Sequence, residues 1–266
     1  MSHRNRLSKS GRESGWISYP AYYWDQSRPP FGIDDIRFWR YCAERYGGPI
    51  LDLCCGNGRY SIPLAELGYE VVGVDINEDM IALAKRRTEK RAKVGRTLRL
   101  VFQVADIVHL KLNRIFNLAI MPGWSFQVLL TQEDQICLLQ RLQEHLASNG
   151  AFAFNLFIPF YRQQGLVEKG GIFKWQPDQS YHSGAQRTYD PISQIETLVE
   201  SNIHPIKLRH TSLAELRLLF QLTGFEISEL YGDDADMRPF TGKRSDDYTI
   251  IVTSMPKPSP HSTDLR

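Results

Sequence analysis

The chain has 266 residues, of which 42% are hydrophobic and 23% are charged. These proportions are ordinary for a globular protein and exclude a disordered chain or a fibre. The formal net charge of +2 gives no support for nucleic-acid binding, because nucleic-acid binders usually present a strongly basic surface. No apolar run reaches the roughly 20 residues that a membrane-spanning helix needs. We therefore expect neither a membrane nor a nucleic acid as partner.

Both ends of the chain are polar. Residues 1–18 carry basic side chains before the first acid, Glu13, and we expect them to form a solvated, disordered tail. An arm that contacts RNA or phosphate is the alternative. Residues 256–266 are rich in Pro and Ser and predict a second disordered tail. The sequence thus predicts one domain over residues 19–255.

The four cysteines indicate a reducing compartment. No two of them form a Cys-x-x-Cys pair, so we expect no metal site. Cys54 and Cys55 are adjacent, which rarely suits a disulfide. A cytoplasmic location fits this pattern best.

Helices and strands alternate along the first two thirds of the chain. In chain order, we expect a helix over 34–46, a strand over 49–53, a helix over 60–67, a strand over 70–75, a helix capped by Asn77, strands over 100–104 and 116–121, a helix from Thr131 to Asn149-Gly150, and a strand over 151–157. Apolar strands that alternate with helices predict an α/β fold with a doubly wound, mostly parallel sheet.

The pattern changes after Phe157. Residues 158–210 contain alternating apolar and polar segments, which predict an inserted antiparallel sheet. A helix should then begin at Ser212 and end at Gly224. Strands over 225–230 and 248–253 should close the fold.

A small-residue turn follows the first predicted strand. Residues 51–59 read Leu-Asp-Leu-Cys-Cys-Gly-Asn-Gly-Arg and open a helix. Glycine lets the backbone pass close to a ligand, and the helix N-terminus offers free N–H groups. In an open α/β sheet, ligands bind at this edge, beyond the ends of the strands.

Three acids follow three predicted strands at the same edge. Asp52 ends the first strand, Asp75 ends the second, and Asp106 follows the third. An acid in the place of Asp75 can accept hydrogen bonds from ribose hydroxyls. Asp106 could reach an adenine amino group.

This series resembles the class I S-adenosylmethionine (SAM)-dependent methyltransferases. Their first motif is an acid followed by a small-residue turn that ends in Gly-x-Gly, as in residues 52–58. Asp75 and Asp106 match their second and third motifs, and Gly224-Phe225 matches the start of their reversed final strand pair. The resemblance covers roughly residues 20–253 and implies a Rossmann-like, seven-stranded sheet with an antiparallel last strand.

The resemblance implies a SAM site. Asp52 and the glycine turn would position the methionine part, Asp75 would hold the ribose, and Asp106 with Ile107 would face the adenine. Met121 would line the sulfonium end, and Tyr22 or Tyr23 would cover the carboxylate. The residues implied to bind the cofactor are Tyr22, Asp52, Cys54, Gly56, Asn57, Gly58, Asp75, Ile76, Asp106, Ile107 and Met121.

The chain departs from the family pattern at two points. Cys54 replaces the first glycine of the usual motif. The fourth strand ends in Met121-Pro122-Gly123-Trp124 rather than the Asn-Pro-Pro-Tyr type of motif of DNA amino-methylating enzymes, which disfavours a base-amino acceptor. A fold that binds a nicotinamide dinucleotide is the alternative explanation of the glycine-rich turn. An acid at the position of Asp52 has no function in such a fold.

The sequence therefore predicts transfer of a methyl group from SAM to a small-molecule acceptor by in-line displacement. A methyltransferase that acts on RNA or protein and a non-catalytic SAM-binding protein remain the alternatives. The N-terminal segment and the insertion should cover the cofactor, so they should form the acceptor side. The pattern assigns no catalytic residue. The candidates for a base or an anion clamp are His182, Arg187, His204 and His210.

Overall fold

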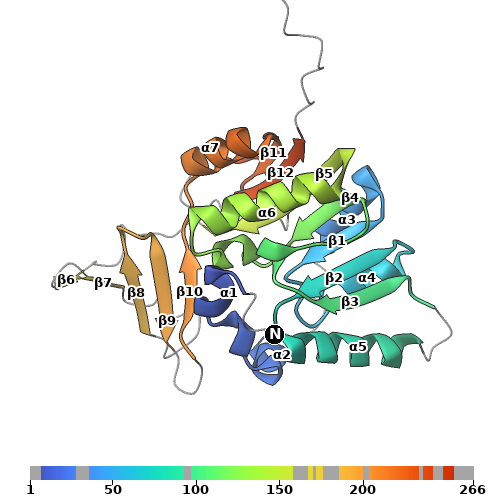
Figure 1. Cartoon of the computed structure of the whole chain (residues 1–266), viewed down its shortest axis with the longest axis horizontal. Helices are drawn as coiled ribbons and strands as arrows, with labels where there is room; N and C mark the ends of the chain where they lie inside the picture. Colours follow the sequence, from blue (N-terminus) through green and yellow to red (C-terminus); the bar gives the residue numbers. More distant parts are fainter. Residues whose placement is uncertain are drawn as a thin grey trace, which may run out of the picture.

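The computed structural model describes residues 7–27, 36–92, 97–157, 167–169, 172–175, 186–199, 204–233, 236–241 and 248–254. They form a seven-stranded main sheet with helices on both faces and a smaller sheet beside it (Figure 1). The terminal residues 1–6 and 255–266 lie outside the described residues, as does His182.

The main sheet has the strand order β3-β2-β1-β4-β5-β12-β11. Its strands are β1 (Ile50–Leu53), β2 (Val71–Asp75), β3 (Leu100–Val104), β4 (Phe116–Met121), β5 (Leu146–Leu156), β11 (Phe225–Tyr231) and β12 (Tyr248–Ser254). The pairs from β3 to β5 are parallel, and β12 runs antiparallel to both of its neighbours. The prediction of a doubly wound sheet with an antiparallel last strand is confirmed.

Two helical layers sandwich this sheet. One face is covered by α3 (Arg37–Tyr46) and α4 (Ser61–Glu66), and the other by α6 (Gln132–His145) and α7 (Leu213–Thr223). The helix α5 (Glu78–Ala92) packs on β3, where Ile81 and Ala84 meet Phe102. Within the part of the chain that the structure describes, no helix combines the length and the apolar character needed to cross a bilayer.

Side-chain caps begin three of the helices where the sequence predicts them. The Oδ1 atom of Asn77 accepts hydrogen bonds from Asp79 N and Met80 N at the start of α5. Thr131 and Ser212 cap α6 and α7 in the same way. Each cap satisfies backbone donors that have no partner inside the helix, so local sequence sets these helix starts.

The junction between α6 and β5 differs from the prediction. The helix ends at His145 and the strand begins at Leu146, whereas Asn149-Gly150 was expected to separate them. Leu146 is buried and pairs with Phe116, after which the register of β4 and β5 shifts. A Cβ atom at Gly150 would lie 3.0 Å from Ala147 O, so glycine allows an irregularity within the strand rather than ending the helix.

The N-terminal segment, residues 7–27, is folded. It contains α1 (Lys9–Glu13), a 3₁₀ turn η2 (Trp16–Ser18) and α2 (Ala21–Ser27). Ser10 donates to Asp134 Oδ2 through both its N–H and its hydroxyl, and its Oγ accepts a hydrogen bond from Leu130 N. The expectation of a disordered tail is therefore wrong for residues 7–18, because buried polar groups of the main domain bind this stretch.

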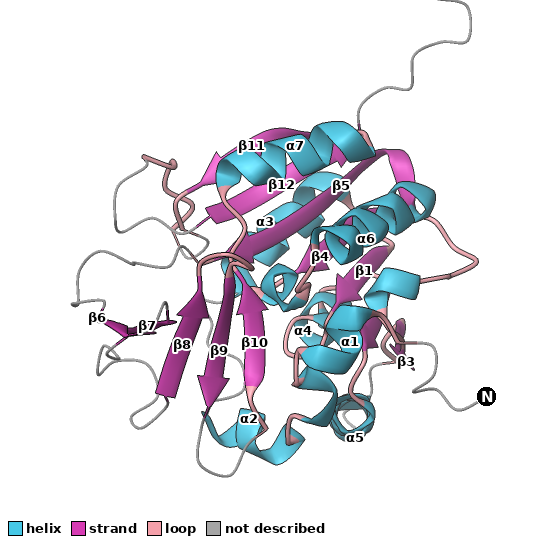
Figure 2. Ribbon diagram, turned by 60° about the vertical axis from the view of Figure 1, so that its left-hand side comes forward, coloured by secondary structure: helices cyan, strands magenta, loops and turns pink. Residues whose placement is uncertain are grey.

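The insertion after β5 forms a separate antiparallel sheet, as predicted. Its order is β10-β9-β8-β7-β6, with the strands β6 (Val167–Lys169), β7 (Ile172–Trp175), β8 (Gln186–Asp190), β9 (Ile195–Val199) and β10 (Ile206–Arg209). Its edge strand β10 lies beside the N-terminal helices (Figure 2). Lys207 N donates to Ser14 O at 2.9 Å, and Gly15 passes so close to Pro205 that a Cβ atom would clash.

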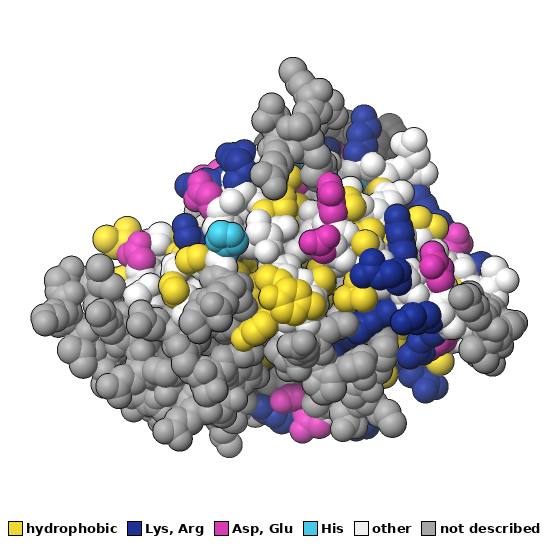
Figure 3. Space-filling view, turned by 90° about the horizontal axis from the view of Figure 1, so that it is seen from below, with side chains coloured by type: hydrophobic (Ala, Val, Ile, Leu, Met, Phe, Trp, Pro, Cys, Tyr) yellow, Lys and Arg dark blue, Asp and Glu magenta, His cyan; other side chains and the backbone are white. Residues whose placement is uncertain are grey.

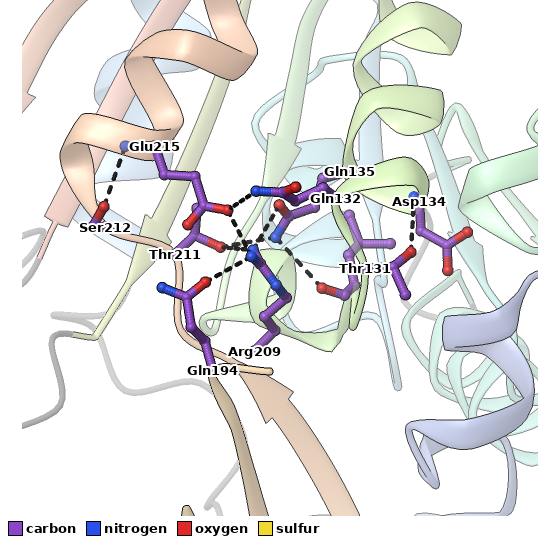
Figure 4. Close-up of polar contacts among 10 residues, drawn as sticks. Thr131, Gln132, Asp134, Gln135, Gln194, Arg209, Thr211, Ser212 and Glu215 are labelled. Carbon is purple, nitrogen blue, oxygen red and sulfur yellow. Dashed lines mark hydrogen bonds and ion pairs between the residues drawn. The ribbon is translucent and has the colours of Figure 1, made fainter. Parts of the chain in front are cut away.

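A buried arginine joins the insertion sheet to the main domain. The guanidinium of Arg209 donates to Gln135 and Thr211 through Nη1, and to Gln194 and Glu215 through Nη2 (Figure 4). Gln135 belongs to α6 and Glu215 to α7, whereas Gln194 lies in the turn before β9 and Thr211 in the link from β10 to α7. The planar fork of arginine suits several fixed acceptors at once, so one side chain holds three elements in place.

We predict that Arg209→Met lowers the free energy of unfolding by about 2–4 kcal/mol, because it leaves buried acceptors, including the Glu215 carboxylate, without their donor. Urea unfolding measures the effect. Arg141→Met is the matched control on the surface of α6, where the exposed pair with Glu144 should contribute about 0.5 kcal/mol or less. Equal effects of the two substitutions would contradict the role given to Arg209.

Candidate cofactor and acceptor site

The loop between β1 and α4 is held in a tight backbone conformation. Cys54, Gly56 and Gly58 all have positive φ angles, of 55°, 54° and 81°. A Cβ atom at Gly56 would meet no other atom within 4 Å, so space lies open beside this residue. Gly58 faces the protein instead, because a Cβ atom there would lie 2.9 Å from Ile62. The turn thus presents its bare backbone to open space on one side and packs on the other.

Asp75 ties the end of β2 to this loop. Its Oδ2 atom accepts a hydrogen bond from Gly56 N at 2.8 Å, and its Oδ1 atom accepts one from Asn77 N at 2.9 Å. Burial raises the pKa of this carboxyl, while the backbone donors act in the opposite direction. Each carboxylate oxygen can accept a further hydrogen bond, so Asp75 can still bind hydroxyl groups of a ligand.

Asp52 is fully buried at the end of β1. Its Oδ2 atom accepts a hydrogen bond from the Ser61 hydroxyl at 2.5 Å, whereas Oδ1 has no hydrogen-bond partner among the described residues. Burial, together with the nearby charge of Asp75, raises the pKa of Asp52 to about 7. A buried carboxylate oxygen without a donor is costly and is suited to receive a cationic group of a ligand.

Ser61 is a functional neighbour that the sequence did not single out. It occupies the third small-residue position counted from Gly56, which would be a glycine or an alanine in a dinucleotide fold. In the structure Ser61 is the first residue of α4, and its hydroxyl donates a hydrogen bond to Asp52. The signal was present in the sequence, since a hydroxyl at the first turn of this helix lies near the end of β1.

Asp106 is reached by the N-terminal segment. Its Oδ1 atom accepts a hydrogen bond from Val108 N, and its Oδ2 atom accepts one from Ser8 N at 2.7 Å. Gly11 lies against the same site, because a Cβ atom there would be 2.7 Å from Asp106 Oδ2 and 2.9 Å from Ile76 Cδ1. The segment therefore covers two residues that the sequence assigns to the cofactor.

The remaining assigned residues lie at different depths. Ile107 is buried, and Met121 is fully buried in the core between the sheet and α6 rather than at an open edge. Tyr22 is 66% exposed, so the structure does not bring it to the other assigned residues. Its neighbour Tyr23 packs instead against Tyr19, with ring centroids 6.1 Å apart.

The paired cysteines are packing residues in this structure. Burial raises the pKa of the Cys54 and Cys55 thiols, and the nearby Asp52 and Asp75 carboxylates act in the same direction. The reactive thiolate is therefore disfavoured at both positions. All four cysteines are free, and the described residues hold no cluster of three or more His, Cys, Asp or Glu side chains that could bind a metal ion.

Trp124 lies three residues after the end of β4 and has a left-handed backbone conformation, with a φ angle of 61°. Its N–H donates to Asn155 Oδ1 at 3.0 Å, and its ring packs edge-on against Phe157. Such a conformation is uncommon for a bulky residue and marks a position that the surrounding structure holds in place. This aromatic pair borders the edge of the sheet at which the glycine loop lies, because Asp52 pairs with Ile120 in β4.

Comparison with known proteins agrees with this geometry. Residues 50–150 match the family described as a methyltransferase domain. The YqeM protein of Bacillus subtilis, which is named as a methyltransferase, is 31% identical over 141 residues, or 53% of this chain and 55% of that protein. The chain thus matches about half of the length of this relative. The cypemycin N-terminal methyltransferase of a Streptomyces species is 25% identical over 220 residues, 77% of this chain and 83% of that protein.

A solved structure shares the whole architecture. The CcbJ methyltransferase from Streptomyces caelestis superposes with a TM-score of 0.74 at 21% identity, and the match covers 92% of this chain and 99% of that chain. The family match and this fold agree. The match over residues 50–150 identifies a methyltransferase domain in this chain, and the chain has the fold of SAM-dependent methyltransferases.

The residues present fit SAM, the cofactor of this family. The unpartnered Asp52 Oδ1 suits the ammonium of the methionine part, and the open space at Gly56 admits a ligand against the backbone. Asp75 would hold the ribose hydroxyls, and Asp106 with Ile76 would border the adenine under the N-terminal segment. The buried carboxylate of Asp52 beside the open backbone at Gly56 suits a nucleoside ligand that carries both an ammonium and a carboxylate.

We predict that Asp75→Ala weakens the binding of S-adenosylhomocysteine by about 1.5–3 kcal/mol, because charged hydrogen bonds to the ligand are lost. Calorimetry measures the affinity. Asp79→Ala, four residues further on in the exposed first turn of α5, should leave it unchanged. Unchanged affinity in Asp75→Ala would remove the support for this site.

The raised pKa of Asp52 predicts proton release on binding. Near neutral pH much of Asp52 is protonated in the free protein, and an adjacent ligand ammonium favours the ionised form, which lowers the pKa. Calorimetry at about pH 6.5 in buffers of different ionisation enthalpy should show release of up to about one proton per S-adenosylhomocysteine bound. In Asp52→Asn the release should disappear, and its persistence there would assign the proton to another group.

Proposed function

We propose that this protein transfers the methyl group of SAM to a small-molecule acceptor. The observation that carries the proposal is the meeting of Asp52, Asp75 and the open side of Gly56 at one edge of the sheet. The similarity to SAM-dependent methyltransferases supports methyl transfer as the reaction, because SAM carries an activated methyl group on its sulfonium sulfur.

The protein's own contribution is positioning and exclusion of water. Methyl transfer by in-line displacement gains mainly from alignment of the reactants, which can contribute about 7–11 kcal/mol. Asp52, Asp75 and the glycine loop would fix one partner. The N-terminal segment, bound to Asp106 and Asp134, would cover it and keep water out. A catalytic base is needed only when the acceptor must lose a proton.

The enclosure of the site favours a small acceptor. The insertion sheet and the N-terminal segment flank the same edge and bond to each other through Lys207 and Ser14. Aromatic side chains gather there, including Trp16 and Tyr19 beside Ile206 of β10. The name of the cypemycin relative describes methylation of a peptide N-terminus, which supports an amine as acceptor atom.

A polymer acceptor remains the second candidate because of one surface feature. Lys and Arg side chains gather beside an apolar patch on the face seen in Figure 3. The helix α5 carries five basic residues, which are Lys85, Arg86, Arg87, Lys90 and Arg91. Two of these have partners within the protein, since Arg91 pairs with Glu66 and Arg87 donates to Asn57 O. Matches to RNA methyltransferases are short, and one of them covers 27% of this chain.

We predict that the acceptor passes through a filter that retains polymers. A cell extract from the source organism would be separated by ultrafiltration, and each fraction would be incubated with the protein and SAM labelled on its methyl group. Labelled product and S-adenosylhomocysteine should form when the filtrate is added. They should still form after the filtrate has been treated with nuclease and protease. Activity confined to the retained fraction would favour RNA or protein instead.

Two further results separate the remaining alternatives. SAM binding without S-adenosylhomocysteine formation in any fraction would favour a non-catalytic SAM-binding protein. Deletion of residues 1–12 would not discriminate between acceptors, because Ser8 and Gly11 lie against Asp106, which is proposed to border the cofactor. Charge reversal at Lys85 and Lys90 on α5 leaves that site intact and should impair only a polymer acceptor.

A further inference from the structure

A buried carboxylate–imidazole pair joins β9 to the end of β10. The Nε2 atom of His210 lies 3.0 Å from Glu196 Oε2, and both side chains are almost completely buried. The Nδ1 atom of His210 lies 3.1 Å from Nε2 of Gln127, which belongs to the 3₁₀ helix η5 (Ser125–Val128) after β4. The pair therefore lies between the insertion sheet and the edge of the main sheet.

Gln127 determines which nitrogen of His210 carries hydrogen. Its Oε1 atom accepts a hydrogen bond from Phe157 N at 3.1 Å, which orients the amide so that its NH₂ group faces the imidazole. The amide then donates to Nδ1, so Nε2 is the ring nitrogen that carries hydrogen toward Glu196. His210 thus presents its Nε2–H to Glu196 and holds the carboxylate in position.

Glu196 belongs to the face of the insertion sheet that turns toward the N-terminal segment. Leu198 pairs with Ile206, and both pack against the aromatic cluster of Trp16 and Tyr19. Residues two apart on a strand share a face, so Glu196 lies on the same face as Leu198. Arg209 lies on the opposite face, where it meets α6 and α7 (Figure 4).

Aromatic rings connect this carboxylate to the cofactor edge. Tyr189 pairs with Glu196 across β8 and β9, and its ring lies 5.6 Å from that of His210. Phe157 lies 5.1 Å from His210 on another side and contacts Trp124 after the end of β4. A carboxylate whose imidazole partner is flanked by aromatic rings combines the two kinds of group that recognise organic ammonium ions.

We propose that Glu196 binds the ammonium group of an amine acceptor and takes up the proton that this nitrogen must lose before it can receive the methyl group, with His210 and Gln127 as positioning residues. The substrate class is then an organic amine rather than an alcohol or a carbon acid. This inference rests on the proposed function, because it assigns the acceptor side of the same site. His210 acts through Glu196, since both of its ring nitrogens are engaged with protein groups.

The test compares probes that differ in charge and match in shape. The wild-type protein, saturated with S-adenosylhomocysteine, is titrated by calorimetry with 2-phenylethylamine and with 2-phenylethanol, and then with hexylamine and hexanol. We expect each ammonium to bind about tenfold or more tightly than its alcohol. In Glu196→Gln, which keeps the shape of the side chain, this preference should vanish.

Two controls isolate the carboxylate. Asp190→Asn removes a negative charge from an exposed turn of the same sheet and should keep the preference. His210→Ala should reduce the preference without changing the affinity for S-adenosylhomocysteine, which a general loss of structure would also lower.

Equal or undetectable binding of amine and alcohol to the wild-type protein would overturn the assignment, and this comparison needs no variant to fold. A preference that survives in Glu196→Gln would overturn it as well. Failure of the wild-type protein to bind S-adenosylhomocysteine would contradict the proposed function instead, so the two failures are distinguishable.

Discussion

Two carboxylates at neighbouring strand ends hold the loop on which the whole site depends. Asp75 accepts hydrogen bonds from the backbone of Gly56 and Asn77, and so fixes the glycine turn relative to β2 and α5. Asp52 lies beneath the turn with one oxygen bonded to Ser61 and the other without a donor. Burying two acids side by side costs stability, as the raised pKa values of both show. Replacing both acids by uncharged residues would make the folded protein more stable. Their presence therefore indicates a ligand that binds the two carboxylates.

The same reliance on buried polar groups extends to the parts that cover this loop. The N-terminal segment binds Asp106 and Asp134, and Asn77 donates to the backbone carbonyls of Trp16 and Tyr19. The aromatic cluster of that segment packs on Met80 of α5 and on Ile206 of β10. One short stretch of chain therefore contacts the cofactor edge and the insertion sheet together.

The order of the main elements could be predicted from sequence because the signals are local. Hydrophobic periodicity identified the strands, and Asn77, Thr131 and Ser212 marked helix starts that the structure confirms. The end of α6 could not be predicted in this way. Asn149-Gly150 has the composition of a helix stop, but pairing with β4 draws residues 146–150 into the strand. The fold of residues 7–18 was also missed, since a polar, basic stretch predicts disorder unless its buried partners are known.

The sequence by itself determined the doubly wound sheet and the positions of Asp52, Asp75 and Asp106, because residues that end successive parallel strands must meet at one edge. Only the tertiary structure decided which partners these acids have. Ser8 lies 98 residues from Asp106, and Ser10 lies 124 residues from Asp134, distances along the chain that no local pattern spans. The tertiary structure also placed Tyr22 in solvent and Tyr23 against the protein, although the two are adjacent in sequence. It brought Glu196, His210 and Gln127 together from three separate segments. Local sequence sets strands, turns and caps, whereas hydrogen bonds between distant segments form only once the chain has folded around them.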